Sequence, residues 1–524
     1  MAALGFGLLS AAALPPFYAL PVLLVTVPAL LALIDGASGP LVAARRGWWF
    51  GFGLNLVGLY WITEAILIEA ARFWWCVPFA VPALAATLAG FVVFATGLAR
   101  LARPGWPRLL TLAGAWVLGD LARQFIGTGF PWNPLGSGWE FPGSLGDVLI
   151  QPAALVGIHG LTLVSILLAG LPSLGWGFRV AGLAVLGAWA GFGLSRTEGP
   201  ARTVGDGRGP GIKVVLVQGD VPEGQKWSRE RALQIFERYL ALTRQGVADA
   251  GPGAKVIVWP ETASPYLLGR EPAVRQAIVA ATGGMPALVG AVRFDHDDRP
   301  RNSLLALAGD AHVVATYDKW HLVPFGEYQP SWFPVPFQVV PGEGFAAGAG
   351  PATLHVPGLP PFGPLICYEA IFPGEVIESR DRPDWMVNIT NDAWFGNSTG
   401  PRQHLAAVRM RAVEEGLPVM RAANTGISAA FDAHGHELAQ VGMNRTGVLV
   451  VPLPGALAPT PFARLGLLIP LGIAAATTVL GLLVRPSSGR KLANTDAKGI
   501  DNETFLSDEN VGSEINVSVD NSRL

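Results

Sequence analysis

The sequence predicts a polytopic α-helical membrane domain joined to an α/β domain. The chain has 524 residues, of which 51% are hydrophobic and only 15% are charged, whereas soluble proteins usually carry about 25% charged residues. Residues 1–200 contain 16 charged side chains and no lysine, while residues 205–455 have the composition of an ordinary globular domain. These observations exclude a wholly soluble enzyme, a disordered scaffold and a disulfide-stapled secreted protein.

Eight apolar segments are candidates for transmembrane helices, because a bilayer core requires about 20 mostly apolar residues per helix. Seven of them lie in residues 1–200 and the eighth follows the α/β domain. They are residues 3–16, 18–34, 48–68, 76–99, 108–124, 149–173, 179–195 and 462–484. Pro15 and Pro16 interrupt the first, so the ends of the first two spans are the least defined. The start lacks the basic region of a cleaved signal peptide, which is the alternative interpretation.

The charges in the loops predict the orientation, because cytoplasmic loops are enriched in Arg and Lys. Basic residues follow alternate spans: Arg45, Arg46, Arg100, Arg103, Arg108, Arg179, Arg485, Arg490 and Lys491. The intervening loops carry mainly acidic residues: Glu64, Glu69, Glu140 and Asp147. We therefore expect a multi-pass membrane protein with both termini cytoplasmic and residues 205–455 facing outward. In a bacterium with two membranes this arrangement means the inner membrane and the periplasm. The inverted topology is the alternative.

Residues 205–455 alternate short apolar runs with helical stretches. Val- and Ile-rich runs suit strands that are buried between layers. The predicted strands are residues 212–217, 256–259, 287–292, 303–308, 313–317, 363–367, 385–389, 419–422 and 447–452. The predicted helices are residues 228–250, 272–283 and 401–416. This order predicts an α/β or α+β sandwich of about 250 residues.

The C-terminal tail, the net charge and the cysteine content bear on possible partners, cofactors and metals. Residues 486–524 are polar and poor in apolar side chains, which is typical of a disordered tail and here predicts a cytoplasmic one. The net charge of -2 gives no sign of nucleic-acid binding. The two cysteines, Cys76 and Cys367, cannot form a zinc framework. The sequence therefore predicts no cofactor, no metal site and no nucleic-acid partner.

Three segments that follow predicted strands carry residues able to do chemistry. They are Val-Trp-Pro-Glu-Thr at 258–262, Tyr-Asp-Lys-Trp-His-Leu-Val-Pro-Phe-Gly-Glu at 317–327, and Leu-Ile-Cys-Tyr-Glu at 365–369. A carboxylate, an ammonium and a thiol at strand ends could converge at one edge of a sheet. The ammonium would favour the thiolate, and the carboxylate could accept the proton. Taken singly, each is more often a surface or core residue, so the prediction depends on the ordered set.

This ordered set resembles the nitrilase superfamily of carbon–nitrogen hydrolases, which carries a Glu-Lys-Cys triad on an αββα sandwich. The resemblance is closest to the membrane-embedded apolipoprotein N-acyltransferase family. This closer resemblance rests on three features: apolar spans on both sides of the α/β domain, Gly-Phe-Pro-Trp at 129–132, and Lys-x-His-Leu-Val-Pro-Phe-Gly-Glu at 319–327. The resemblance covers residues 1–484 and implies a nitrilase-like catalytic domain at residues 205–455.

The resemblance implies a role for each matched residue. Glu261 would be the general base, Lys319 the oxyanion stabiliser and Cys367 the nucleophile. Glu327 would help to place Lys319 and the incoming amine. The main-chain N–H of Tyr368 would be a second oxyanion donor. Glu369 follows the nucleophile as it does in the family.

The implied reaction has two steps. Cys367 attacks the sn-1 ester of a phospholipid, which gives a thioester acyl-enzyme and a lysophospholipid. The α-amino group of the N-terminal S-diacylglyceryl-cysteine of an apolipoprotein then takes the acyl chain. The partners are therefore a phospholipid donor and a lipoprotein acceptor, and the family implies a monomer.

Aromatic residues near the predicted site are expected to contact lipid, because each CH₂ pulled into water would cost about 0.8 kcal/mol. Trp227 matches an aromatic near the lipid pocket of the family. The Pro-rich stretch 330–337 is expected to form a mobile arm at the interface. The expected contacts are Trp227, Trp332, Phe333, Phe337 and Trp394, with Phe395 beside the last. Inward packing is the alternative for these clusters.

Other interpretations remain open at this stage. The same triad could belong to a membrane-tethered amidase or nitrilase that uses water as the second nucleophile. A transporter or assembly factor with an inactive nitrilase-like domain is a second alternative. Asp120 and His159 lie inside predicted spans and are expected to be structural, with Asp120 paired to Arg123. The loop at 129–134 is expected to rest on the α/β domain or to be anchored in lipid headgroups by Trp132.

Overall fold

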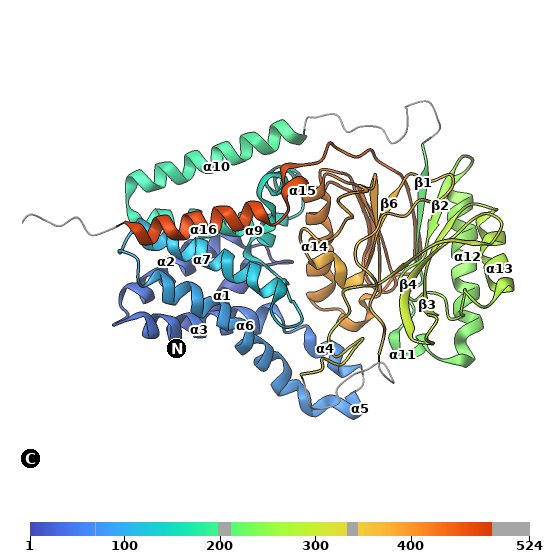
Figure 1. Ribbon diagram of the computed structural model, residues 1–524, viewed down its shortest axis with the longest axis horizontal. Coiled ribbons are helices and arrows are strands. Elements are labelled where there is room, and N and C mark those ends of the chain that lie inside the picture. The colour runs from blue at the N-terminus through green and yellow to red at the C-terminus, as the bar shows by residue number, and fades with distance from the viewer. Residues whose placement is uncertain (69, 198–210, 333–343, 485–524) are drawn as a thin grey trace, which may run out of the picture. The chain divides into compact units, whose positions relative to one another are not determined.

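The computed structural model describes residues 1–68, 70–197, 211–332 and 344–484, which all lie within one compact unit. A helical region comes first, an α/β region follows, and a last helix returns to the helical region (Figure 1). The predicted polar tail, Phe333 and Phe337 lie outside the described residues. The first residues of the predicted α/β domain, 205–210, lie outside them as well.

Each predicted span contains a helix. These helices are α1 (Ala2–Ser10), α2 (Leu23–Asp35), α3 (Pro40–Gly58), α6 (Val77–Ala99), α7 (Trp106–Phe125), α9 (Ala153–Gly170), α10 (Trp176–Thr197) and α16 (Leu468–Leu483). Within the described residues, three stretches are long and apolar enough to cross a membrane: Ala70–Ala99, Ala153–Leu174 and Trp176–Thr197. The apolar helices Ala2–Ala13, Leu20–Asp35 and Leu468–Leu483 are shorter. Eight membrane crossings therefore stay a prediction.

Glycines let these helices approach one another closely, as is common in membrane bundles. A Cβ added to Gly7 of α1 would lie 2.0 Å from the main-chain oxygen of Phe50 on α3. A Cβ added to Gly114 of α7 would lie 2.5 Å from the main-chain oxygen of Ala474 on α16. The last helix therefore packs tightly against the first group, although more than 250 residues separate them along the chain.

One predicted span is divided. The segment 48–68 was expected to be continuous, but α3 ends at Gly58 and two short helices follow, α4 (Ile62–Leu67) and α5 (Ala70–Phe73). Leu59 and Trp61, which lie between α3 and α4, are buried and pack with Leu88 of α6. The helix therefore ends where these side chains are buried, and the continuous apolar pattern of the sequence does not mark that position.

The α/β region contains two sheets. The six-stranded sheet has the order β11-β1-β2-β3-β4-β5, and the five-stranded sheet has the order β10-β9-β8-β7-β6. The strands are β1 (Lys213–Gln218), β2 (Lys255–Val258), β3 (Ala287–Phe294), β4 (Pro300–Leu307), β5 (Val313–Asp318), β6 (Phe362–Ile366), β7 (Trp385–Thr390), β8 (Val419–Ala423), β9 (Ser428–Phe431), β10 (Glu437–Val441) and β11 (Gly447–Pro452). β1, β2 and β3 pair in parallel, as do β6, β7 and β8.

The two sheets face each other and are covered by helices, which gives the expected αββα order of layers. One core cluster joins the sheets and includes Leu216, Val256, Ile366 and Trp385. Helices α12 (Ala232–Ala250) and α13 (Pro272–Thr282) cover the six-stranded sheet, and α14 (Gly400–Glu415) covers the five-stranded sheet (Figure 1). The far side of α14 faces the helical region, where it packs on α9.

All nine predicted strands and all three predicted helices of this region are present, but two strands were missed. β9 has the sequence Ser-Ala-Ala-Phe and β10 has Glu-Leu-Ala-Gln-Val. Neither has the run of β-branched residues that marks a buried strand. β10 is also an edge strand and is largely exposed, so its pattern is weak.

Candidate functional site

The three predicted site residues follow strands that face each other across the sandwich. Glu261 follows β2 and Lys319 follows β5, both in the six-stranded sheet, whereas Cys367 follows β6 in the five-stranded sheet. All three are buried, with exposed fractions of 5%, 1% and 6%. The fold therefore brings Lys319 and Cys367, which are 58 and 106 positions after Glu261 in the sequence, into one interior region with it.

Lys319 lies between two carboxylates. Its Nζ is 3.2 Å from Oε1 of Glu261, and 3.0 Å and 2.9 Å from the two carboxylate oxygens of Glu327. The main-chain N–H of Val323 donates to Glu327 at 2.8 Å. Glu327 is thus held by its own loop and contacts the Lys319 ammonium through both carboxylate oxygens.

Two asparagines that the sequence did not reveal complete this cluster. The Nδ2 atom of Asn302 donates to Glu261 at 2.6 Å and to Glu327 at 3.0 Å. The main-chain N–H of Asn391 donates to the other oxygen of Glu261 at 2.8 Å. Asn302 lies on β4, between β3 and β5, and no motif marks it. The only feature of the sequence that points to Asn302 is its position on β4, the strand that pairs with the strand before Lys319.

The protonation states follow from these contacts. Burial alone would raise the pKa of Glu261, but Lys319, Lys226 and the two asparagine donors hold it below its ordinary value. Burial would lower the pKa of Lys319, but Glu261 and Glu327 raise it well above its ordinary value. The resting cluster therefore contains an ammonium between two carboxylates.

Cys367 occupies a strained turn. Its φ is +51°, a left-handed conformation that is rare for a residue other than glycine and common at functional sites. Burial, and then the charge of Glu261, raise the pKa of its thiol, while Lys319 lowers it. The net shift is upward, which favours the neutral thiol over the thiolate.

The residues after Cys367 hold the turn in place. The Glu369 carboxylate accepts hydrogen bonds from the Tyr317 hydroxyl at 2.9 Å and from the main-chain N–H groups of Trp320 and Ile366 at 2.7 Å and 2.6 Å. The Glu369 carboxylate thus links the turn at Cys367 to the segment around Lys319 by hydrogen bonds. Burial, opposed by these donors, raises the pKa of Glu369 to about 7.

The Gly-Phe-Pro-Trp loop of the helical region rests on the α/β region. The hydroxyl of Tyr368 donates to the main-chain oxygen of Gly129 at 2.9 Å. Trp132 is 3% exposed, and its indole N–H donates to Gln403 of α14 at 2.9 Å. Anchoring of Trp132 in lipid headgroups is therefore the wrong alternative. The turn that carries the candidate nucleophile is bonded directly to the helical region.

The expected lipid contacts differ in exposure. Trp227 and Trp332 are 59% and 64% exposed, and Trp394 is half-buried. The indole N–H of Trp227 donates to Glu223 at 2.8 Å, which orients the ring. Phe395 instead packs inward, with its ring centroid 4.6 Å from that of Trp61.

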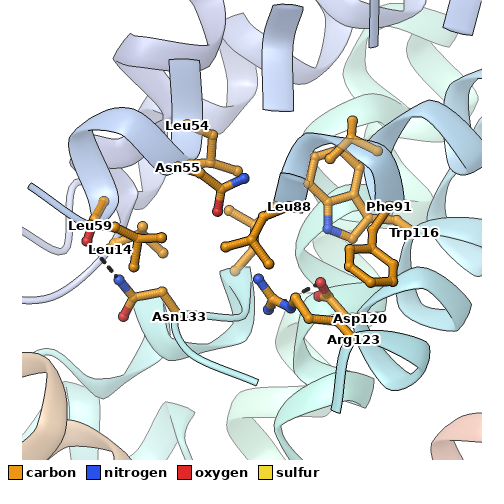
Figure 2. A pocket seen from close by; sticks show the side chains of 13 residues that line it. Leu14, Leu54, Asn55, Leu59, Leu88, Phe91, Trp116, Asp120, Arg123 and Asn133 are labelled. Carbon is orange, nitrogen blue, oxygen red and sulfur yellow. Dashed lines mark hydrogen bonds and ion pairs between the residues drawn. The ribbon is translucent and has the colours of Figure 1, made fainter. Parts of the chain in front are cut away.

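Asp120 and His159, the two polar residues expected inside spans, differ in their surroundings. Asp120 pairs with Arg123 at 3.2 Å, as predicted, and both line a cavity of about 20 Å³ between α3, α6 and α7. Figure 2 shows their side chains beside Asn55 and Asn133. His159 is fully buried, and neither ring nitrogen has a hydrogen-bond partner among the described residues.

Two groups in the described part of the chain have the residue types of a metal site. Cys367, Asp392 and His404 form one, and Asp432, His434 and His436 form the other. The carboxylates of both groups already accept hydrogen bonds from protein groups: Asp392 from Arg421 and Thr390, and Asp432 from the main-chain N–H groups of both histidines.

Two family models match the two regions of the chain. The model described as apolipoprotein N-acyltransferase N-terminal domain matches residues 6–171, and the model described as carbon-nitrogen hydrolase matches residues 213–461. Two curated relatives named apolipoprotein N-acyltransferase match nearly the whole chain. The one from Rhodopseudomonas palustris is 38% identical, with 91% of this chain and 94% of that protein covered. The one from Bradyrhizobium diazoefficiens is also 38% identical, with 92% and 94% covered.

The chain belongs to the apolipoprotein N-acyltransferase family. The α/β region is also similar to solved structures of the nitrilase superfamily. The Nit3 protein of Saccharomyces cerevisiae gives a TM-score of 0.36 at 20% identity, covering 46% of this chain and 90% of its own. An amidase from Nesterenkonia sp. gives a TM-score of 0.35 at 16% identity, covering 49% and 94%.

Proposed function

We propose that this protein transfers an acyl chain from a membrane phospholipid to the N-terminal amino group of an S-diacylglyceryl apolipoprotein, through a thioester on Cys367. The observation that carries the proposal is the buried Glu261–Lys319–Glu327 cluster facing Cys367. This cluster lies in a carbon-nitrogen hydrolase region that is joined to the N-terminal domain of this acyltransferase family. No cofactor enters the reaction.

In the first half-reaction, the sulfur of Cys367 bonds to the carbonyl carbon of the sn-1 ester while the thiol proton passes to Glu261. Lys319 stabilises the negative charge that develops on the carbonyl oxygen, which is the usual role of a fixed donor in a buried site. The bond to the glycerol oxygen then breaks. Glu261 returns its proton to that oxygen, so a lysophospholipid leaves and the acyl thioester remains.

In the second half-reaction, the α-amino group of the lipoprotein attacks the thioester carbon. An α-amino group has a pKa of about 7.7–8.0, so a useful fraction is neutral near pH 7. Glu261 accepts the proton that the amine loses, and Lys319 again stabilises the oxyanion. The carbon–sulfur bond breaks, an amide forms, and Cys367 regains its proton.

Both substrates are lipids in part, which explains the attachment of this site to apolar helices. Extraction of an acyl chain into water would cost about 0.8 kcal/mol per CH₂. The exposed side chains of Trp227 and Trp332, with Trp394, would lie where donor and acceptor chains enter from the leaflet. The site then faces the periplasm, both termini are cytoplasmic, and the protein works as a monomer in the bacterial inner membrane.

The test is a reconstituted reaction with a phospholipid labelled in its sn-1 chain and a diacylglyceryl-cysteine lipopeptide acceptor. We expect the label to appear as an amide on the lipopeptide, and C367S to yield none, while C76S transfers at the wild-type rate. Amide formation by C367S would contradict the proposal. Release of labelled free fatty acid in place of the amide would instead identify a hydrolase.

A further inference from the structure

A buried histidine lies behind the nucleophile turn and has no role in the mechanism above. His404 is on α14 and is 0% exposed. Its Nδ1 is 2.9 Å from Oδ1 of Asp392, and its Nε2 is 3.0 Å from the main-chain oxygen of Cys367. The imidazole thus connects a buried carboxylate to the residue proposed as the nucleophile.

The two closest polar neighbours of the imidazole accept hydrogen bonds. A third, Nη2 of Arg421, lies farther away, 3.4 Å from Nδ1, and donates to Asp392. Asp392 is ionised because, although burial alone would raise its pKa, Arg421 and His404 hold that pKa at about 2. Arg421 donates to Oδ2 of Asp392 at 2.5 Å, and Thr390 donates to Oδ1 at 3.0 Å. A main-chain carbonyl has no proton to give. Each ring nitrogen of His404 must therefore carry its own hydrogen.

We infer that His404 is an imidazolium in the resting protein and acts as a positioning residue for Cys367. It holds the carbonyl of the strained turn and places a positive charge behind the thiol. A neutral ring would direct one lone pair at an oxygen that can only accept. The inference rests on the proposed function, in which Cys367 is the nucleophile.

The surroundings fit a buried cation. The rings of Trp132 and Phe395 have their centroids 5.8 Å and 6.1 Å from that of His404, close to the range of cation–π contact. Asp392, with one negative charge, faces two positive charges, on His404 and Arg421. This side of the site therefore carries one surplus positive charge.

That surplus acts on the sulfur. The Cys367 thiol, the Asp392 carboxylate and a His404 ring nitrogen all lie within 4.8 Å of one another. From the other sheet, Glu261 and Lys319 also act on the thiol, and the charge of Lys226 is coupled to it. The imidazolium offsets Asp392, which otherwise opposes the thiolate, and so lowers the cost of forming the thiolate during attack.

Solid-state NMR of the full-length protein in lipid bilayers tests the charge directly. Histidine is labelled with ¹⁵N and cysteine with ¹³C at the carbonyl. Cys76 packs with Ile66 and Phe73, so the dipolar contact of Cys367 with Nε2 identifies His404 without any substitution. We expect both nitrogens of this ring to show the protonated signature. One unprotonated nitrogen would overturn the inference, and thioester formation would be untouched by that result.

The variant H404Q tests the consequence, because its amide can still donate to the Cys367 carbonyl but carries no charge. With Cys76 replaced by Ala throughout, we expect Cys367 acylation to slow about tenfold or more, the change that one pKa unit produces. The apparent KM for phospholipid stays the same, and the pH profile of Cys367 alkylation by iodoacetamide moves upward.

The matched control is H312Q, at a histidine whose side chain is 78% exposed. It should behave as wild type in both assays. A merely structural role of His404 would lower the melting temperature of H404Q without moving the alkylation profile, and an unmoved profile would overturn the inference. If H404Q fails to fold, the NMR result on the unsubstituted protein decides alone.

Discussion

Two buried ion clusters in this molecule are built in different ways. In the α/β region, Lys319 contacts both Glu261 and Glu327, and Asn302 donates to both carboxylates. In the helical region, Asp120 and Arg123 form a single pair, and buried polar atoms of both have no hydrogen-bond partner among the described residues. In the first cluster every charged group is paired by protein groups, and only Oδ1 of Asn302 has no partner among the described residues. In the second cluster charged groups themselves have unpaired atoms.

The difference reflects what each cluster must do. A buried charge is costly unless it is paired and hydrogen-bonded. The cavity beside Asp120 and Arg123, of about 20 Å³, has room for about one water molecule that could supply the missing bonds. The charges of the Lys319 cluster are paired by protein groups and need no water molecule between them. Fixed charges of this kind stabilise transition states effectively.

The largest expected effect is that of K319M, which removes the ammonium and leaves two carboxylates facing each other. We expect acylation of Cys367 to fall by about 10³-fold, as for loss of an oxyanion donor. We also expect a loss of about 3–5 kcal/mol in the free energy of unfolding. Rates of thioester formation and chemical denaturation measure the two. The control is K255M, because the Lys255 ammonium donates to the main-chain oxygen of Gly253 in its own turn. Equal losses of rate and stability in both variants would contradict a special role for Lys319.

A smaller effect is expected for E327Q. The amide oxygen can still accept from Lys319, but one of the two negative charges on the ammonium is lost. We expect Cys367 acylation to slow by about 10- to 100-fold, the cost of weakening a hydrogen bond between charged groups. Single-turnover kinetics against E378Q, a glutamate outside the cluster, provide the measurement. A rate within twofold of wild type would show that Glu261 alone positions Lys319.

The variant N302A tests the residue that the sequence did not reveal. It removes the donor shared by Glu261 and Glu327, and hydrogen bonds to charged groups contribute about 1.5–3 kcal/mol. We expect a loss of about tenfold in the rate of thioester formation, smaller than for E327Q because both ion pairs remain. Stopped-time mass spectrometry of the acyl-enzyme measures it. An unchanged rate would mean that the two carboxylates need no common support.

The smallest effect on the rate is expected for D120N in the helical cluster. It removes a charge from the pair with Arg123 and should lower the melting temperature, because it leaves a buried cation without its partner. The rate of lipid transfer by the folded protein should stay close to that of wild type, because Asp120 and Arg123 lie on α7 of the helical region and outside the Lys319 cluster. A large loss of transfer with an unchanged melting temperature would show that this cluster also serves catalysis.

The sequence predicted the parts of this molecule that depend on local pattern. Eight apolar segments, nine strands and the Glu261, Lys319 and Cys367 segments can each be found from short runs of residues. The break after Gly58 could not, because it depends on the packing of Leu59 and Trp61 against another helix. β9 and β10 lack the composition of strands and form by pairing, β9 with β8 and β10 with β9.

The supporting residues of the site were beyond the sequence for a similar reason. Asn302, Asn391 and His404 act through contacts with residues 12 to 130 positions away, and no motif marks those contacts. The nearby ammonium was expected to favour the thiolate of Cys367, and Lys319 does lower the pKa of the thiol. The sequence could not show that burial and Glu261 raise that pKa by more. Burial is a property of the fold and cannot be read from the neighbours in the chain.

Intact-protein and peptide mass spectrometry of the purified protein, after incubation with phospholipid alone, tests the central claim most directly. The account predicts one acyl adduct on Cys367 that hydroxylamine removes and that disappears when a diacylglyceryl-cysteine peptide is added. K319M should show almost none at the same time point. An adduct on another residue, or complete transfer to the peptide by a protein whose Cys367 is never acylated, would contradict the account.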